Sequence, residues 1–228
     1  MRSRSTPRDG RPKPPSSEIE LLNNASALAG QTLGQLAQSL DATVPDNLLH
    51  AKGWVGELIE VALGADAGSR PVPDFETLGI ELKTLPLNTR LQPQESTFVS
   101  SAPLANTVGM QWETSAVKAK LSKVLWIPVE AAKALPIAKR RIGSAFLWSP
   151  SQEDEHILRA DWEEHIERIA FGHLDELDAR HGTYLQIRPK ALNRNELTVA
   201  TDVTGAPTST LPRGFYLRTS FTRKILLR

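Results

Sequence analysis

Two acids and a lysine stand close together in the segment PDFETLGIELKT, at Asp74, Glu81 and Lys83. Ile80 and Leu82 alternate with Glu81 and Lys83, and a period of two is typical of a strand with one buried face. Glu81 and Lys83 are therefore expected to point the same way. A carboxylate beside an ammonium group on one strand face is a candidate site for chemistry on a phosphate.

A turn at Gly79 could bring Asp74 alongside this strand. The polar residues before Gly79 favour a turn, so residues 72–75 could form a short strand that folds back on the next one. Two carboxylates about 4 Å apart repel by ~4 kcal/mol at a protein-like dielectric. Ionised Asp74 and Glu81 therefore need a cation, and Lys83 offsets only part of their charge.

Oxygen ligands of this kind suit Mg²⁺, which binds few protein carboxylates and keeps coordination positions for water and a phosphate substrate. Such an ion activates water and stabilises the charge that builds up during phosphodiester hydrolysis. Lys83 is expected to orient the water as a cation, and to act as a base only if the metal offsets the acids. The spacing alone is a weak signal, because an exposed hairpin with a solvated ion pair would look the same.

The bulk composition limits the classes of protein. With 228 residues and 40% hydrophobic content, the chain suits one large domain or two small ones, and one is simpler. The absence of cysteine excludes disulfides and thiolate zinc sites. No apolar run approaches the ~20 residues of a membrane span, and the N-terminus lacks the apolar core of a secretory signal. A cytoplasmic protein without membrane contact is expected.

The charge is unevenly distributed. Residues 1–15 carry five Arg and Lys against Asp9, whereas the remaining chain has 22 basic residues against 25 acidic ones. Residues 1–17 are expected to be a disordered basic arm, because they have almost nothing to bury. The arm could touch nucleic acid or serve only as a solubilising tail. Residues 18–228 are expected to form a single domain.

Periodicity indicates a mixed α/β protein, with a central sheet flanked by helices. Ser151, followed by acids at 153–155, predicts the start of a long helix whose buried stripe holds Leu158, Trp162 and Ile166. Helices are predicted at 17–28, 33–40, 47–63, 114–122 and 151–179. Strands are predicted at 80–85, 96–102, 124–129, 146–148, 184–187 and 215–218.

The sequence around the triad resembles the MutH family of methyl-directed mismatch repair endonucleases, which belongs to the type II restriction endonuclease superfamily. The segment KGWVGELIEVALGADAGSRPVPDFETLGIELKTLPL matches the family's core. Further blocks follow in the family's order: TFVSSAPL, WETSAVKAKLSKVLWIPVE, RRIGSAFLWSP, ARHGTYLQIRPKA and LPRGFYLRTSFT. Together they cover most of the chain from about residue 18. The resemblance implies a restriction endonuclease-like fold with two lobes around a DNA-binding cleft.

The resemblance also implies roles for residues at the site. Asp74, Glu81 and Lys83 match the family's catalytic triad, with the metal held by the two acids and the backbone carbonyl of Leu82. Glu60 matches a further acid near the metal, although on residue type alone it would be a surface glutamate. Lys120 matches a basic residue near the cleavage centre, whereas residues 118 and 123 could simply be a solvated face.

A second group of residues is implied to bind DNA. Arg188, Pro189 and Lys190 follow a predicted strand and match the loop that reads GATC, where each good base contact discriminates by ~1 to 3 kcal/mol. Lys52 is assigned to the same surface. Tyr216 matches the tyrosine associated with sensing adenine methylation, and a packed core tyrosine is the competing interpretation.

The implied activity is a nick in the unmethylated strand at a hemimethylated GATC site, dependent on Mg²⁺ with Mn²⁺ as a substitute. The implied partners are double-stranded DNA, a MutL-type ATPase activator and, indirectly, MutS. One triad suits a monomer that cuts one strand. GADAGSR lacks the lysine of a P-loop, so no nucleotide cofactor is expected. Two alternatives stay open, a stand-alone GATC-specific restriction endonuclease and a non-catalytic DNA-binding relative.

Overall fold

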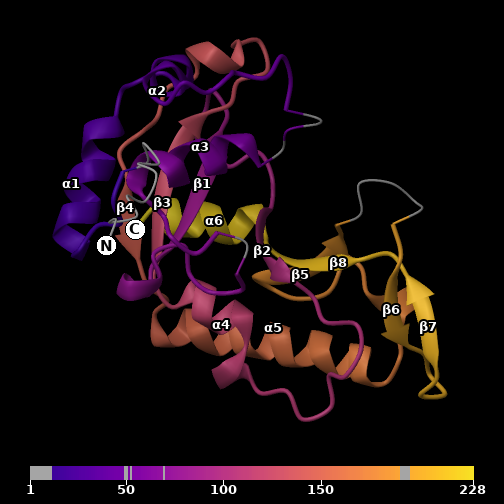
Figure 1. Ribbon diagram of the computed structural model, residues 1–228. Coiled ribbons are helices and arrows are strands. Elements are labelled where there is room, and N and C mark those ends of the chain that lie inside the picture. The colour runs from indigo at the N-terminus through magenta and orange to yellow at the C-terminus, as the bar shows by residue number, and fades with distance from the viewer. Residues whose placement is uncertain (1–11, 49–50, 52, 69, 191–195) are drawn as a thin grey trace, which may run out of the picture.

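The computed structural model describes residues 12–48, 51, 53–68, 70–190 and 196–228 (Figure 1). Its helices are α1 (Glu18–Leu28), α2 (Leu33–Ser39), α3 (Trp54–Leu63), α4 (Ala116–Leu121), α5 (Gln152–Ala170) and α6 (Thr219–Leu226). Its strands are β1 (Glu81–Leu87), β2 (Thr97–Ser101), β3 (Val124–Glu130), β4 (Phe146–Trp148), β5 (Leu185–Pro189), β6 (Thr198–Thr201), β7 (Pro207–Thr210) and β8 (Arg213–Leu217). No helix in these ranges is long and apolar enough to cross a bilayer.

The strands form two three-stranded sheets and a hairpin. In the first sheet, β1 pairs in parallel with β3, which pairs antiparallel with β4. In the second, β8 lies between β2 and β5 and is antiparallel to both. The hairpin of β6 and β7 projects from the edge of the molecule (Figure 1). The predicted mixed α/β class is observed. Its strands are divided among separate sheets and do not form one central sheet.

Buried side chains form two hydrophobic clusters. The helical core contains Leu21, Leu33, Leu36, Leu58, Ile59 and Leu63 from α1, α2 and α3, together with Leu82, Leu125 and Ile127. The sheet core contains Val99, Leu185, Phe215, Trp162 and Phe221 from the second sheet, α5 and α6, together with Leu85 and Trp126. Strands β1 and β3 thus contribute to both cores. The strand carrying Glu81 is covered on both faces, instead of having one solvent face as predicted.

Two predicted helices have different ends. The helix predicted over 47–63 begins at Trp54, although residues 49–50 and 52 lie outside the described ranges. The helix predicted over 151–179 ends at Ala170. Gly172 explains the early end, because its φ is +74° and a Cβ there would lie 2.1 Å from the backbone of Asp202. Only glycine fits where the chain at residue 172 passes the backbone of Asp202, and its positive φ ends the helix.

The predicted N-terminal arm is partly ordered. Residues 1–11 lie outside the described ranges, so the expectation of disorder is untested there. Residues 12–17 differ from it: Pro15 is buried, and the Ser17 hydroxyl caps α1 by accepting from the Glu20 amide. The chain at Lys13 passes so close to the end of α3 that a Cβ on Gly64 would lie 2.5 Å from its carbonyl oxygen.

Candidate active site

A tight turn brings the segment before β1 back against it. The amide of Phe75 donates to the Ile80 carbonyl at 2.9 Å, and the Ile80 amide donates back at 3.3 Å. Gly79, at φ +63°, closes the short 3₁₀ turn between them. The predicted strand over 72–75 is therefore reduced to a single bridge, but the predicted reversal of the chain is present.

This reversal places Asp74 beside β1. The Leu82 amide donates to Asp74 Oδ2 at 2.8 Å. On its other side, the Asp74 carbonyl accepts from the amides of Asp66 at 3.0 Å and Ala67 at 3.2 Å. The aspartate is thus fixed by main-chain contacts on both sides, and its carboxylate lies against the main chain of the strand that carries Glu81 and Lys83.

Glu81 is a buried carboxylate held by two ammonium groups. Its side chain is 1% exposed, and the side chains of Lys83 and Lys120 are each 13% exposed. Lys83 contacts Glu81 Oε1, as expected from their common strand face. Lys120 Nζ, from α4, lies 2.9 Å from each carboxylate oxygen. The structure therefore brings together three residues separated by up to 39 positions.

The neighbouring acids disfavour one another's charge. Burial raises the pKa of Glu60, on α3, to about 7, and the nearby Asp74 carboxylate adds to the rise. The pKa of Asp74 is also raised, by burial first and then by Glu81. Fully ionised, the three carboxylates would outnumber the two ammonium groups of Lys83 and Lys120. Oxygen donors with a deficit of positive charge are the setting that a hard divalent cation prefers.

A finished metal cage is not present within the described ranges, where no three or more Asp, Glu, His or Cys side chains are gathered closely enough to hold an ion. Both Glu81 oxygens already accept from ammonium groups. A metal ion that bound Glu81 would therefore compete with Lys83 and Lys120 for the same two carboxylate oxygens.

Two other lysines near the site are ion-paired. Lys118 contacts Glu155 at the start of α5, and Lys123 contacts Glu18 at the start of α1. Both pairs are partly exposed to solvent, so the interpretation of these lysines as a solvated face stays open. Lys118 and Lys120 point to different partners, so the short helix α4 is fastened to α5 while it presents Lys120 to Glu81.

The second sheet has one polar face. Phe98 lies opposite Tyr216, which lies opposite Gln186 on the other side. The flanking residues of β8 belong to the sheet core, so alternation places Tyr216 on the opposite face. Its ring packs edge-on against Phe98 at 5.3 Å, and the Arg188 guanidinium lies 6.0 Å from the ring centroid. Tyr216 is therefore half-buried beside Arg188 and is not a core side chain.

Arg188 and Lys190 are held by serine hydroxyls. Arg188 donates to Ser96 Oγ at 2.7 Å, and Lys190 donates to Ser101 Oγ at 3.1 Å. Lys190 also lies 4.5 Å above the Phe98 ring. The prediction of a loop at 188–190 needs correction, because β5 continues through Pro189. Lys52 and residues 191–195 lie outside the described ranges.

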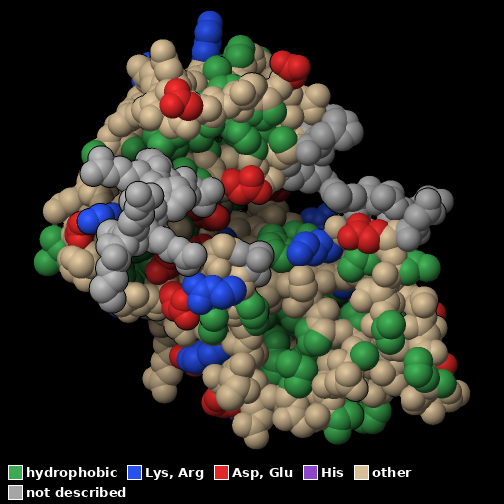
Figure 2. All heavy atoms as spheres, in the orientation of Figure 1, with side chains coloured by type: hydrophobic (Ala, Val, Ile, Leu, Met, Phe, Trp, Pro, Cys, Tyr) green, Lys and Arg blue, Asp and Glu red, His purple; other side chains and the backbone are tan. Residues whose placement is uncertain are grey.

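Figure 2 shows a hollow between the part of the molecule that contains α2 and α3 and the part below it, with acidic and basic side chains on its walls. Sequence reasoning missed two residues, Ser96 and Gln186, that line a groove together with Arg188. Gln186 could have been found from Arg188, since residues two apart on a strand share a face. Ser96 gives no such signal.

Comparison with known proteins identifies the family. The model of the DNA mismatch repair enzyme MutH matches residues 63–161. Over 214 residues, 94% of this chain and 95% of the relative, the chain is 53% identical to the DNA mismatch repair protein MutH of Vibrio campbellii. The protein of that name from Photorhabdus laumondii is 52% identical over 217 residues, 95% of each chain. One from Escherichia coli is 51% identical over 215 residues, 94% of each chain. The chain belongs to the MutH family.

Membership of the MutH family confirms the predicted restriction endonuclease-like α/β fold. It also confirms the predicted activity: the protein is a DNA mismatch repair endonuclease, a hydrolase that acts on DNA. MutH proteins of this nuclease class require a divalent metal ion and act together with other repair proteins.

Proposed function

We propose that this MutH-family endonuclease nicks the unmethylated strand at hemimethylated GATC sites, 5′ to the guanine, with Mg²⁺ as its ion and Mn²⁺ as a substitute. The observation that carries this proposal is the buried Glu81 carboxylate, bridged by Lys83 and Lys120 next to Asp74. Acids with raised pKa values beside two ammonium groups form a site that can take a cation and a phosphate together.

Asp74, Glu81 and the Leu82 carbonyl are the groups that would hold the ion, with Glu60 close by. The bound ion supplies Lewis-acid activation of water and neutralises charge on the phosphate. The oxygen donors and the raised pKa values of Asp74 and Glu60 fit this assignment, because burial and then the neighbouring acids raise these pKa values and a cation would offset both effects.

The side chains themselves orient the reactants. Lys83 meets Glu81 as an ammonium donor and can hold the attacking water by a hydrogen bond. Lys120 is anchored on both oxygens of Glu81 and can stabilise negative charge on the phosphate. Without the ion, Glu60 can hold or release a proton near neutral pH, because its pKa is about 7.

Sequence choice is assigned to the polar face of the second sheet, together with Pro189 and Lys52. Arg188, Pro189 and Lys190, with Lys52, read GATC through base edges in the major groove. Tyr216 lies beside Arg188 and Phe98, where its ring can sense a methyl group on adenine. Glu81 and Lys83 lie on a strand of the first sheet, whereas Arg188, Pro189 and Tyr216 lie on strands of the second.

The whole molecule suits a strand-selective repair reaction in the cytoplasm. One triad cuts one strand, so a monomer suffices. Activation by a MutL-type ATPase after MutS finds a mismatch is assigned from the family. Residues 18–228 form one domain with two lobes around the DNA, and the two separate hydrophobic cores support this division.

A circular DNA with one hemimethylated GATC site tests the proposal. With Mg²⁺ and the MutL-type activator, the expected product is nicked circles without linear DNA. Asp74→Ala, Glu81→Ala and Lys83→Ala should each slow nicking by roughly 10²- to 10⁴-fold while DNA affinity stays within a few-fold. Linear product without any partner would favour the restriction endonuclease, and binding without cleavage under all conditions would favour the non-catalytic relative.

Arg188→Ala tests the assignment of sequence choice. Its ratio of nicking at GATC to nicking at a scrambled site should fall by about 10-fold or more, since a base contact is lost. Arg180→Ala is a matched control, because Arg180 is 86% exposed and its guanidinium pairs with Asp178. An unchanged ratio in Arg188→Ala would remove this residue from the reading surface.

A further inference from the structure

A polar groove of about 510 Å³ lies next to the reading surface and has no role in the scheme above. Three segments meet in it: the residues before β2, the polar face of β5 and the first turn of α6. Its lining consists of Gln94, Glu95, Ser96, Gln186, Arg188, Arg218, Thr219 and Ser220. Two guanidinium groups therefore face one carboxylate, and Glu95 is exposed to solvent.

Gln186 is an unusual side chain for the floor of this groove. It is only 6% exposed and lines the groove, but its amide atoms are not among the fully buried polar atoms that lack a partner. Buried polar groups in proteins are nearly always paired. The Gln186 amide is therefore open to the groove, where it can bond to water or to a ligand.

The start of α6 also lines the groove. The helix begins after Arg218, whose side chain makes no capping hydrogen bond. The first amides of a helix have no acceptor inside the helix, and they carry the positive end of its dipole. Thr219 and Ser220 are exposed at this end. The groove thus combines free amide donors with a partial positive charge, which favours an anion.

Arg218 adds a full positive charge. Its guanidinium donates to three carbonyls, those of Ala179 at 2.7 Å, Gly182 at 2.9 Å and His181 at 2.9 Å. No carboxylate lies within ion-pair distance of it in the part of the chain that the structure describes. The carbonyl contacts fix the guanidinium but leave its charge uncompensated.

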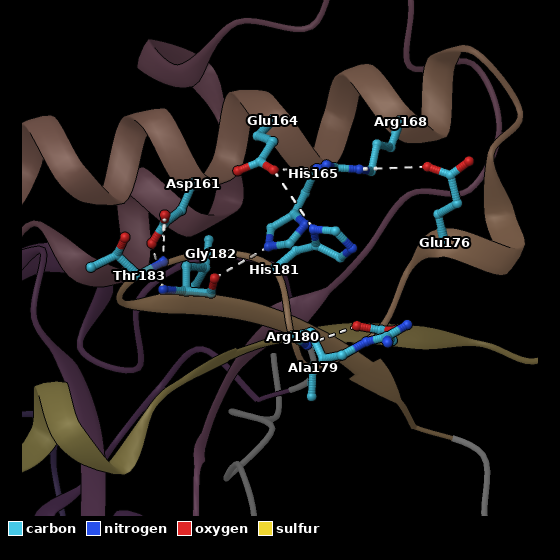
Figure 3. A network of polar contacts seen from close by, with 12 residues as sticks. Asp161, Glu164, His165, Arg168, Glu176, Ala179, Arg180, His181, Gly182 and Thr183 are labelled. Atoms are coloured by element: carbon cyan, nitrogen blue, oxygen red, sulfur yellow. Dashed lines mark hydrogen bonds and ion pairs between the residues drawn. The ribbon is translucent and has the colours of Figure 1, made fainter.

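The turn that holds Arg218 is itself rigid. Asp161, on α5, accepts from the amides of Thr183 at 2.7 Å, Tyr184 at 2.6 Å and Leu185 at 2.8 Å. Figure 3 shows Asp161 and Thr183 joined in this way beneath the helix, with Gly182 next to them. The same contacts fix the start of β5 and so the position of Gln186. The groove is therefore preorganised.

We propose that this groove binds a phosphate of the DNA backbone, through the Gln186 amide, the Arg218 charge and the free amides at the start of α6. Amides, glutamine, arginine and helix N-termini are the donors that proteins use for DNA phosphates. Arg188 lines both this groove and the reading surface, so a duplex read by Arg188 runs past it. The inference rests on the proposed function, and it assigns the groove to positioning of the duplex and not to base reading.

Ser220→Asp tests the proposal without weakening the fold. An acid in the first turn stabilises a helix, whereas it repels a phosphate at the same place. In metal-free buffer at about 0.1 M salt, the variant should bind a hemimethylated GATC duplex about 10-fold more weakly, and the slope of log Kd against log salt should fall by about 1. Ser220→Asn should lose less affinity for the duplex than Ser220→Asp. This comparison separates the effect of the added charge from the effect of a larger side chain. Gln186→Leu should lose affinity several-fold.

Ile19→Asp is the matched control for the added charge. Ile19 lies in the first turn of α1, is 73% exposed and does not line the groove, and Figure 1 shows α1 apart from β2 and β5. Its affinity for the duplex should stay within about 2-fold of the unmodified protein, with the same salt slope. Equal losses in Ile19→Asp and Ser220→Asp would overturn the proposal, because general charge repulsion would then explain both.

Duplexes with one neutral methylphosphonate at each backbone position locate the contact. The unmodified protein should lose affinity at a phosphate that Ser220→Asp no longer senses. A loss of affinity by the same factor in the unmodified protein and in Ser220→Asp, at every position that carries a methylphosphonate, would overturn the proposal. So would a site for free phosphate only, seen as thermal stabilisation by inorganic phosphate that Ser220→Asp abolishes while its DNA affinity is unchanged. Failure to nick GATC with normal binding and a normal Ser220→Asp effect would reject the proposed function but leave the groove assignment standing.

Discussion

Glu81 is the residue on which the site depends. A buried carboxylate without partners is costly, and Lys83 and Lys120 provide the compensating charge. These ammonium groups occupy the oxygens that a metal ion also needs. The lysines therefore stabilise the protein before the ion arrives and compete with it afterwards.

Lys120→Ala should separate these two effects. Removing one positive charge should tighten Mn²⁺ binding by about 3- to 10-fold, as measured by titration calorimetry. The rate of nicking should nevertheless fall by roughly 10²-fold, because the phosphate loses a donor. Lys118→Ala is the control, since Lys118 contacts Glu155 instead, and its Mn²⁺ affinity should not change. Weaker Mn²⁺ binding by Lys120→Ala would contradict this account.

Glu60 should make stability depend on pH. Its folded-state pKa of about 7 lies above its ordinary value of 4.5, so stability falls as pH rises between these values. Without metal at pH 8, Glu60→Gln should raise the free energy of unfolding by about 1 kcal/mol, after allowance for partial solvent exposure, and Tm by about 2–4 °C. At pH 4 the gain should vanish. Glu57→Gln, an exposed change on the same helix, should show no such trend in thermal unfolding.

Among the elements, α5 and α6 are joined at one buried charge. Asp154, in the first turn of α5, is 0% exposed and accepts from Ser151 Oγ at 2.8 Å, Lys224 at 3.1 Å and Arg228. Burial alone would raise the pKa of Asp154, but the hydrogen bonds from Arg228, Ser151 and Lys224 hold it below its usual range. This aspartate caps one helix and fastens the other.

Asp154→Asn should lower the free energy of unfolding by about 2–4 kcal/mol at pH 7, because two cations lose their buried partner. A lowered folded-state pKa gives stability that is present above the ordinary value of 3.8 and is lost as pH falls below it. The difference from the unmodified protein in chemical denaturation should therefore shrink towards pH 3. Glu153→Gln, at a neighbouring exposed position, should cost less than about 0.5 kcal/mol. A difference of equal size at both pH values would refute the role of this charge.

Sequence patterns predicted the elements whose signals are local. The period of two located β1, and the capping residue Ser151 marked the start of α5. The short helix α6 and the hairpin of β6 and β7 were missed, since neither has a long periodic run. The triad and its partner Lys120 were named from the family resemblance, but the contact of Lys120 with Glu81 depends on how α4 packs. The groove at Gln186 joins three segments distant in sequence, and only the fold reveals it.

The whole molecule has two cores that share one pair of strands. Leu82 and Leu125 face the helical core, whereas Leu85 and Trp126 face the sheet core. Neither core can be lost without exposing a face of β1 or β3. The two cores are therefore expected to unfold together, even though each has its own helices.

Leu125→Ala tests this cooperativity. The substitution should cost about 2–5 kcal/mol, because Leu125 is fully buried in the helical core. Four of the five tryptophans, Trp112, Trp126, Trp148 and Trp162, report on the sheet core. Denaturation followed by tryptophan fluorescence and by far-UV circular dichroism should shift by the same amount and remain coincident. A fluorescence transition that does not move would show that the cores unfold independently.

The hydrogen bond that orients Asp74 comes from the peptide N–H of residue 82, not from a side chain. Genetic drift can therefore exchange almost any amino acid at that position without deleting the donor, and only proline removes it. The orientation of the Asp74 carboxylate is thereby preserved in most substitutions of residue 82. Loss of this carboxylate's function should therefore arise chiefly from substitutions of Asp74 itself. Chemical synthesis with an ester in place of that single amide would be the direct means of loosening it.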